Sequence, residues 1–126
     1  MVQFTEEVIL PQKILESLKI NISGSVVMHI GIVHPSSEGK KVVSIEYQAE
    51  RSEGEGELFL IAAEVRAKWQ IQDIGLYRRM GKLNLGDAIL VAAVAAPHRR
   101  EAFEACMEAV ERMRNMVSVK KEEIVA

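Results

Sequence analysis

One apolar run constrains the fold more than any other feature of this sequence. Residues 88–96, AILVAAVAA, carry no polar side chain, and the run is bounded by Gly86 and Asp87 on one side and Pro97 on the other. A helix that crosses a bilayer needs about 20 apolar residues, so the run is too short to be one. Successive side chains of a strand point to opposite faces, so a strand that is apolar throughout must be covered on both. The run therefore predicts the central strand of a sheet.

The rest of the chain predicts strands and helices around this strand. We expect strands at residues 2–10, 23–34 and 42–49, and two or three within 71–96 with turns at 80–82 and 85–87. Helices are expected at 11–20, 56–70 and 98–115. Residues 23–34 and 42–49 are expected to form a β-hairpin with a long loop, 50–57 a mobile loop, and 116–126 a short tail. The order β-α-β-β-α-β-β-α, with mostly antiparallel strands, indicates the α+β class.

Size, charge and cysteine content exclude several function classes. A length of 126 residues favours one domain, and a net charge of −2 gives no general attraction to nucleic acid or to an anionic membrane. The single cysteine, Cys106, rules out an internal disulfide and indicates a reducing, cytoplasmic setting. The acidic N-terminal stretch lacks the basic region of a signal peptide. On the last expected helix, the residues predicted to face inward are Ala102, Phe103, Cys106, Val110 and Met113.

Three basic residues, His98, Arg99 and Arg100, stand where the last helix begins. A cation in the first turn of a helix is unfavourable by roughly 0.3–1 kcal/mol, because the N-terminal end carries partial positive charge. A bound phosphate or carboxylate would offset this cost, since backbone N–H groups also point out of the helix there. The alternative is that these side chains extend into solvent, with Glu101 and Glu104 as partners.

Other basic groups are candidates of the same kind. Arg78 and Arg79 are neighbours on one expected strand, so only one of them can face a given pocket. His29 and His34 are five residues apart, which places them on opposite faces of a strand unless Gly31 makes a bulge. Neither a metal-binding Cys/His spacing nor a glycine-rich phosphate loop is present, so no metal or cofactor is expected.

The segment GKLNLGDAILVAAVAAPHRREAFEA resembles the large, catalytic subunit of molybdopterin synthase. That family has a turn of the type R-x-G-x-L-x-x-G-[DE], an apolar strand, and then A-x-H-R-x-x-A-F-x-A. The residues that fit are Arg79, Gly81, Leu83, Gly86, Asp87, Ala96, His98, Arg99, Ala102, Phe103 and Ala105. Upstream, GSVVMHIGIVH, VVSIEYQAE and Trp69 resemble further family segments in the same order. The resemblance implies an α/β-hammerhead-like single domain over residues 1–126.

The resemblance also implies a reaction and its partners. The large subunit is expected to form a homodimer at the centre of a heterotetramer, each copy binding a small ubiquitin-like subunit with a C-terminal thiocarboxylate. Sulfur passes from that thiocarboxylate to cyclic pyranopterin monophosphate, building the dithiolene of molybdopterin. Lys121 matches the lysine expected to be catalytic, and a shift of the match by one residue would put Lys120 in its place. Arg114 stands at the position of a second lysine. The expected anion-binding residues are His98, Arg99, Arg79 and His34, the His-Arg pair reaching across the dimer.

Two departures from the family pattern leave a second hypothesis open. Arg114 replaces a lysine and cannot serve as an amine nucleophile, and His34 replaces an arginine and is only partly charged near neutral pH. The alternative is therefore a catalytically impaired relative that acts as a dimeric module binding the small subunit or a phosphate ligand.

Overall fold

The computed structural model describes residues 1–19 and 24–125 and has the expected α+β class. The elements in chain order are β1 (Val2–Thr5), α1 (Pro11–Ser17), β2 (Ser25–Ile32), β3 (Ser36–Ser37), β4 (Lys40–Gln48), α2 (Arg51–Lys68), β5 (Asp73–Arg79), β6 (Gly81–Asn84), β7 (Ala88–Ala96), α3 (Arg99–Arg114) and β8 (Lys120–Val125). The eight elements of the predicted order all appear in sequence, and with β6 three strands lie within 71–96, where two or three were expected. Strands β3 and β8 are additional.

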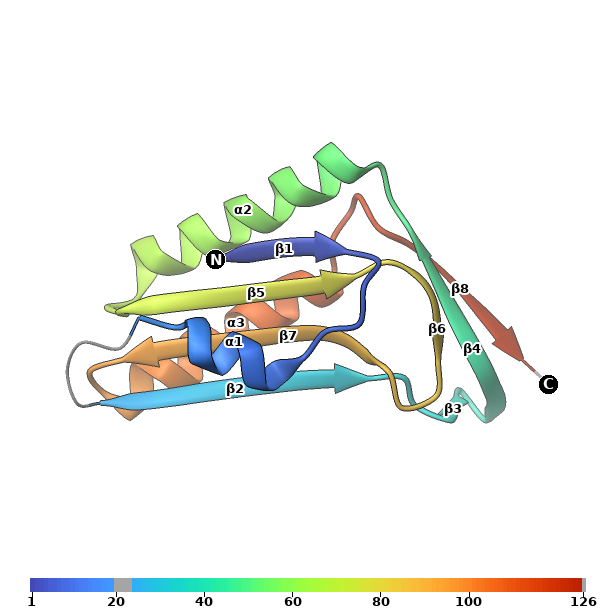
Figure 1. Cartoon of the computed structure of the whole chain (residues 1–126), viewed down its shortest axis with the longest axis horizontal. Coiled ribbons are helices and arrows are strands. Elements are labelled where there is room, and N and C mark those ends of the chain that lie inside the picture. Colours follow the sequence, from blue (N-terminus) through green and yellow to red (C-terminus); the bar gives the residue numbers. More distant parts are fainter. Residues whose placement is uncertain (20–23, 126) are drawn as a thin grey trace.

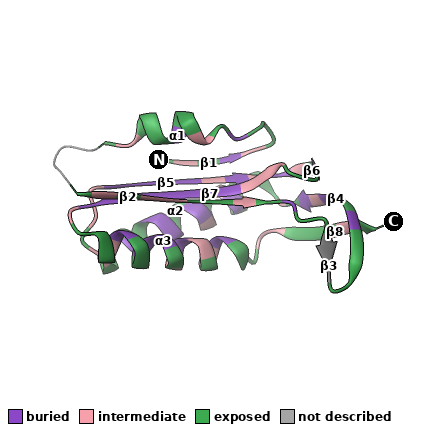
Figure 2. Cartoon of the chain, turned by 90° about the horizontal axis from the view of Figure 1, so that it is seen from below, coloured by how far each residue is buried: buried purple, intermediate pink, exposed green. Residues whose placement is uncertain are grey.

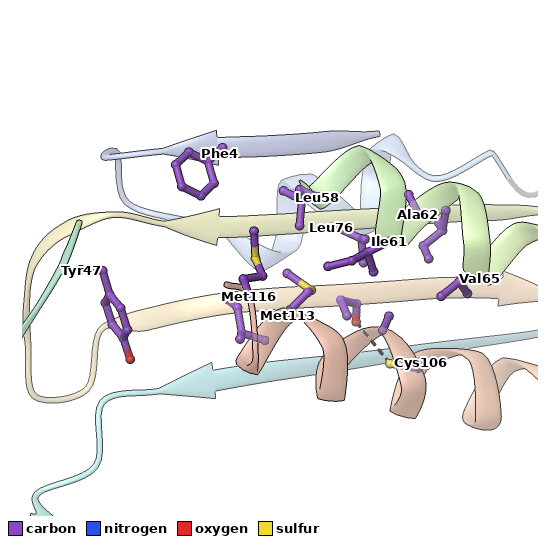
Figure 3. Close-up of a cluster of buried hydrophobic side chains, with 14 of the residues drawn as sticks. Phe4, Tyr47, Leu58, Ile61, Ala62, Val65, Leu76, Cys106, Met113 and Met116 are labelled. Carbon is purple, nitrogen blue, oxygen red and sulfur yellow. Dashed lines mark hydrogen bonds between the residues drawn. The ribbon is translucent and has the colours of Figure 1, made fainter. Parts of the chain in front are cut away.

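The apolar run forms the inner strand β7 of the first sheet, as predicted. The strand order is β1-β5-β7-β2, and only the β1–β5 pair is parallel. Helix α1 covers one face of this sheet, and α2 and α3 cover the other (Figure 2). Val91 and Ala93 pack with Ile14 of α1, whereas Ala92 and Val94 join the larger core beneath α2 and α3. Figure 3 shows part of this larger core, including Leu58 and Met113. Both faces of β7 are therefore buried.

A second sheet stands at one end of the first (Figure 1). Its inner strand is β4, which pairs antiparallel with β6 on one side and β8 on the other. The expected hairpin between residues 23–34 and 42–49 is wrong: β2 pairs with β7 from Ser25 to Ile32, and β4 leaves for the second sheet. Pairing with the apolar strand β7 places β2 beside a buried strand, whereas a hairpin through a turn at 35–41 would pair it with β4.

The segment 50–57 is helix rather than a mobile loop. Glu50 caps α2, its carboxylate accepting hydrogen bonds from the backbone N–H groups of Ser52 (3.2 Å) and Glu53 (2.8 Å). Gly54 is buried against the ring of Phe4. A glycine is required at this position because the helix lies so close to β1, so its presence does not mark a loop.

Two further expectations need correction. Residues 120–125 form strand β8 instead of a tail, because pairing with β4 satisfies their backbone groups. Phe103 is 59% exposed, because Ala102, Cys106, Ala109 and Met113 already fill the inward stripe of α3. Val110 is half-buried at the edge of that stripe.

Candidate active-site cavity

A cavity of about 490 Å³ lies where the first sheet, the second sheet and the C-terminal end of α3 meet. Its apolar wall is formed by Ile30, Ile32, Ile45, Ile89, Leu90, Met113, Met116 and Val119. Its polar lining consists of His29, His34, Tyr47, Arg78, Arg114, Lys121 and Glu123. Cationic or basic side chains thus outnumber the one carboxylate among the lining residues, which suits an anionic ligand with an apolar body.

Strand pairing places Lys121 in this cavity. In the β4–β8 ladder Lys121 lies opposite Tyr47, and Glu123 lies opposite Ile45. Directly opposed residues of an antiparallel pair share a face, so all four side chains point to the cavity side of the second sheet. The Lys121 Nζ is 4.0 Å from Glu123 Oε2, and the lysine side chain is 48% exposed. An amine is thereby held at the mouth of the cavity, accessible to an incoming chain.

The turn between α3 and β8 is fastened to α2. The Glu57 carboxylate accepts hydrogen bonds from the backbone N–H groups of Val117 (2.9 Å) and Ser118 (3.0 Å) and from the Ser118 hydroxyl (2.5 Å). Burial disfavours the charged form of Glu57, but these hydrogen bonds and the positive charge of Arg112 outweigh burial and lower its pKa. The start of β8, and with it Lys121, is positioned by a group on another helix.

Arg114 is the last residue of α3 and lines the cavity beside buried Met113. A cation at a helix C-terminus interacts favourably with the partial negative charge there. Arg114 can therefore reach an anion in the cavity without the unfavourable charge–dipole term that affects the first turn.

The arginine of β5 that lines the cavity is Arg78, whereas Arg79 was the expected anion-binding residue. Arg79 points elsewhere: its Nε donates to the Glu6 carbonyl (3.2 Å), and its guanidinium lies 3.6 Å from the Asp87 carboxylate. Alternation along the strand predicted that one of the two would face a pocket. Choosing between them required the position of the second sheet, whose Tyr47 packs against Arg78.

Both histidines of the 25–34 region line the cavity. The β2–β7 pairing shifts between Gly31 and Ile32, and β2 ends before His34, so strand alternation no longer separates His29 from His34. No cluster of three or more His, Cys, Asp or Glu side chains suited to a metal occurs within the described residues.

His98 and Arg99 lie at the opposite end of α3. The helix has 16 residues, and the 15 steps of 1.5 Å from Arg99 to Arg114 span about 22 Å. His98 is the N-cap residue and makes no side-chain capping bond, Arg99 is exposed, and Arg100 pairs with Glu104 at 3.2 Å. Within one chain, the structure therefore brings together His34, Arg114 and Lys121, but not the His98–Arg99 pair or Arg79.

Cys106 is a core residue, as expected from its place on the apolar stripe. It is 3% exposed, and its thiol donates to the Ala92 carbonyl at 3.5 Å (Figure 3). Burial raises the pKa of this thiol to about 11, which keeps it protonated at neutral pH.

Comparison with known proteins identifies the family. The MoaE protein family matches residues 4–116. A molybdopterin synthase catalytic subunit from Bacillus subtilis is 33% identical over 122 residues, which are 97% of this chain and 78% of that protein. The chain belongs to the MoaE family. A human molybdopterin synthase catalytic subunit is 28% identical to this chain over 124 residues, which are 98% of this chain and 66% of that protein. The MoaE assignment places the chain in molybdenum cofactor biosynthesis.

Solved structures agree with the MoaE assignment. The molybdopterin synthase structure from Staphylococcus aureus superposes with a TM-score of 0.90 at 30% identity, covering 98% of this chain and 90% of that one. A complex of subunits 1 and 2 of the molybdopterin-converting factor from Helicobacter pylori shares the fold, with a TM-score of 0.74 at 8% identity over 98% of this chain and 84% of that chain. None of the helices formed by the described residues is long and apolar enough to cross a membrane.

Proposed function

We propose that this chain transfers sulfur from the C-terminal thiocarboxylate of a small ubiquitin-like subunit to cyclic pyranopterin monophosphate, producing the dithiolene of molybdopterin. The observation that carries the proposal is the cavity itself: Lys121 and Arg114 both line it, part of its wall is apolar, and its volume of about 490 Å³ is sufficient for a small ligand. Family membership and the named relatives support the same reaction.

Lys121 is the residue to which we assign the chemistry. In each transfer the C–S bond of the thiocarboxylate breaks, water supplies an oxygen to the carbonyl carbon, and the small subunit departs as a carboxylate. The sulfur bonds to a side-chain carbon of the pterin, from which an oxygen substituent leaves. An amine beside that carbonyl can serve as a general acid or base, or can form a transient amide-type link to it. Arg114 and His34 would hold the anionic groups, and Arg114 stays protonated, so it cannot act as an amine nucleophile.

The small subunit and a second copy of the chain are the proposed partners. The solved Helicobacter pylori complex joins two molybdopterin-converting factor subunits on this fold, which supports a small-subunit partner here. His98 and Arg99 lie about 22 Å along α3 from Arg114. We assign them to the cavity of the other copy in a homodimer, where an exposed basic pair at a helix start would add to the positive charge.

Two neighbouring lysines provide a matched test of the mechanism. Lys120 and Lys121 are consecutive on β8, so their side chains point to opposite faces, and only Lys121 lines the cavity. With thiocarboxylated small subunit and cyclic pyranopterin monophosphate, dithiolene formation is followed through its fluorescent oxidation product. We expect Lys121→Ala to lose at least about 100-fold in rate, the usual range for a lost acid–base group, and Lys120→Ala to stay within about threefold.

Small-subunit binding, measured separately, shows which step is lost. Loss of activity in Lys121→Ala with binding retained supports the assignment, whereas full activity removes Lys121 from the mechanism. If the unaltered chain binds the small subunit but yields no product, the impaired binding module becomes the better description. Restoring the family pattern with Arg114→Lys and His34→Arg then tests whether those two positions account for the missing activity.

A further inference from the structure

Arg78 is a buried cation with an unusual set of partners. The residue is 4% exposed, and its guanidinium carbon lies 4.2 Å from the centre of the Tyr47 ring. Its Nη1 donates to the carbonyl of Arg79 at 3.1 Å and makes a longer contact of 3.5 Å with the carbonyl of Ile89. One face of the guanidinium is thus covered by an aromatic ring, and one nitrogen is occupied by backbone oxygens.

The charge of Arg78 is only partly compensated. No ion pair joins its guanidinium to a carboxylate within the described part of the chain, and its buried Nε has no acceptor there. Burial lowers the pKa of Arg78, with Tyr47 acting in the opposite direction, but an arginine stays protonated at neutral pH. An isolated buried charge is costly unless it is paired, and an unpaired buried N–H adds to that cost. Such a group is stabilised when a ligand brings the missing anion.

The position of Arg78 determines where that anion would lie. Arg78 and Leu90 line the cavity from the first sheet, next to buried Met113 of α3. Lys121 on β8 and Arg114 at the end of α3 are exposed. The carbonyl contacts and the Tyr47 ring fix the guanidinium plane before any ligand arrives. A fixed guanidinium edge suits an oxyanion that accepts two parallel hydrogen bonds, such as a phosphate oxygen pair or a carboxylate.

We propose that Arg78 binds the oxyanion end of the ligand at the floor of this cavity, while Lys121 and Arg114 act nearer its mouth. The inference rests on the proposed function only for the identity of the ligand, because both ligands of that reaction carry a suitable group: a phosphate on the pterin and the terminal carboxylate or thiocarboxylate on the small subunit.

The test is a titration of the ¹⁵N-labelled chain, observed at the arginine Nε–Hε resonances. The Arg78 signal is identified by its absence in Arg78→Lys, and inorganic phosphate and glycylglycine are added separately at constant ionic strength. We expect a saturable shift of the Arg78 signal with at least one of them. Phosphate alone would assign the floor to the pterin phosphate, and glycylglycine alone to the small-subunit terminus. No shift with either anion overturns the proposal.

Variants give an independent measure. Arg78→Gln and Arg78→Lys are each expected to weaken binding of the same anion roughly tenfold to hundredfold, the range for a lost charge-assisted pair of hydrogen bonds. Arg51→Gln, at a residue whose side chain is 77% exposed, is the control for charge alone and should bind like the parent. Unchanged affinity in folded Arg78→Gln overturns the proposal; if both Arg78 variants fail to fold, the titration of the parent decides it.

Failure of the proposed function gives a different pattern. A saturable Arg78 shift with phosphate, together with no dithiolene product and no small-subunit binding, would retain the anion site and reject the reaction. Dithiolene formation without any shift of the Arg78 signal would retain the reaction and reject the anion site.

Discussion

Two glycines of α2, two residues apart, should respond in opposite directions to the same substitution. Gly54 is buried, and a Cβ added to it would lie 2.3, 2.6 and 2.7 Å from three atoms of the Phe4 ring. Gly56 is exposed, and a Cβ there would have no neighbour within 4 Å. Contacts below 3 Å with an aromatic ring require the whole ring to move, because a ring has no flexible end.

The expected magnitudes follow from these contacts. Replacing glycine by alanine inside a helix favours folding by about 0.8–1 kcal/mol, so Gly56→Ala should raise the free energy of unfolding by up to about 1 kcal/mol. Gly54→Ala gains the same term but must displace Phe4, and overpacking of this kind costs about 1–3 kcal/mol. We therefore expect Gly54→Ala to be destabilised by up to about 2 kcal/mol, and the two variants to differ by about 1–3 kcal/mol.

Urea unfolding followed by circular dichroism measures both variants, with an unchanged m-value confirming that the same surface is exposed. Adding Phe4→Leu should recover part of the loss in Gly54→Ala and none of the effect of Gly56→Ala, since only the first pair is in contact. Equal stabilisation by the two alanines would show that helix propensity decides at both positions and that the close approach of β1 to α2 does not limit position 54.

Two further predictions concern single side chains. Cys106 should resist a thiol reagent at pH 8 in the folded protein and react fully in denaturant, because the thiol is buried with a pKa of about 11; rapid reaction of the folded chain would contradict its burial. Glu57→Gln should lower the free energy of unfolding at pH 7 by about 1 kcal/mol through loss of charge-assisted hydrogen bonds to 117–118. Because the folded-state pKa of Glu57 is lowered, its contribution to stability is present above the ordinary value of 4.5 and is lost as pH falls through the folded-state pKa. The difference in the free energy of unfolding between Glu57→Gln and the parent should therefore narrow at acidic pH. A difference that does not change with pH would refute the assignment.

The elements that could be predicted are those whose sequence pattern is local and strong. The run 88–96 has no polar position, and the helix of residues 99–114 has small or apolar residues at regular spacing, so both were placed correctly. In contrast, KKEEIV has four charged residues out of six and gives no apolar alternation, yet it forms β8. Its strand conformation comes from pairing with β4, a partner more than seventy positions away in the chain.

The same distinction separates the predictable part of the site from the rest. The family resemblance led to Lys121, Arg114 and His34, and all three line one cavity. The alternation of side chains along a strand predicted that Arg78 and Arg79 face opposite ways. Which of them faces the cavity depends on the position of the second sheet, which is assembled from three separate segments of the chain. Tyr47 was not predicted to be a site residue, because its role arises only where β4 brings its ring over Arg78.

The second sheet is what turns separate basic residues into a site. Register along β4 sets Tyr47 opposite Lys121, the same Tyr47 covers the guanidinium of Arg78, and the Glu57 carboxylate fixes the turn from which β8 begins. A slip of one residue in the β4–β8 pairing would direct Lys120 into the cavity and Lys121 out of it, because the side-chain period of a strand is two. Fastening of residues 117–118 by α2 opposes such a slip at the start of the strand. Whether Lys120 or Lys121 enters the cavity therefore depends on the Glu57 carboxylate, which belongs to α2 and lies outside the cavity lining. The sequence around the two lysines could not decide between them for this reason.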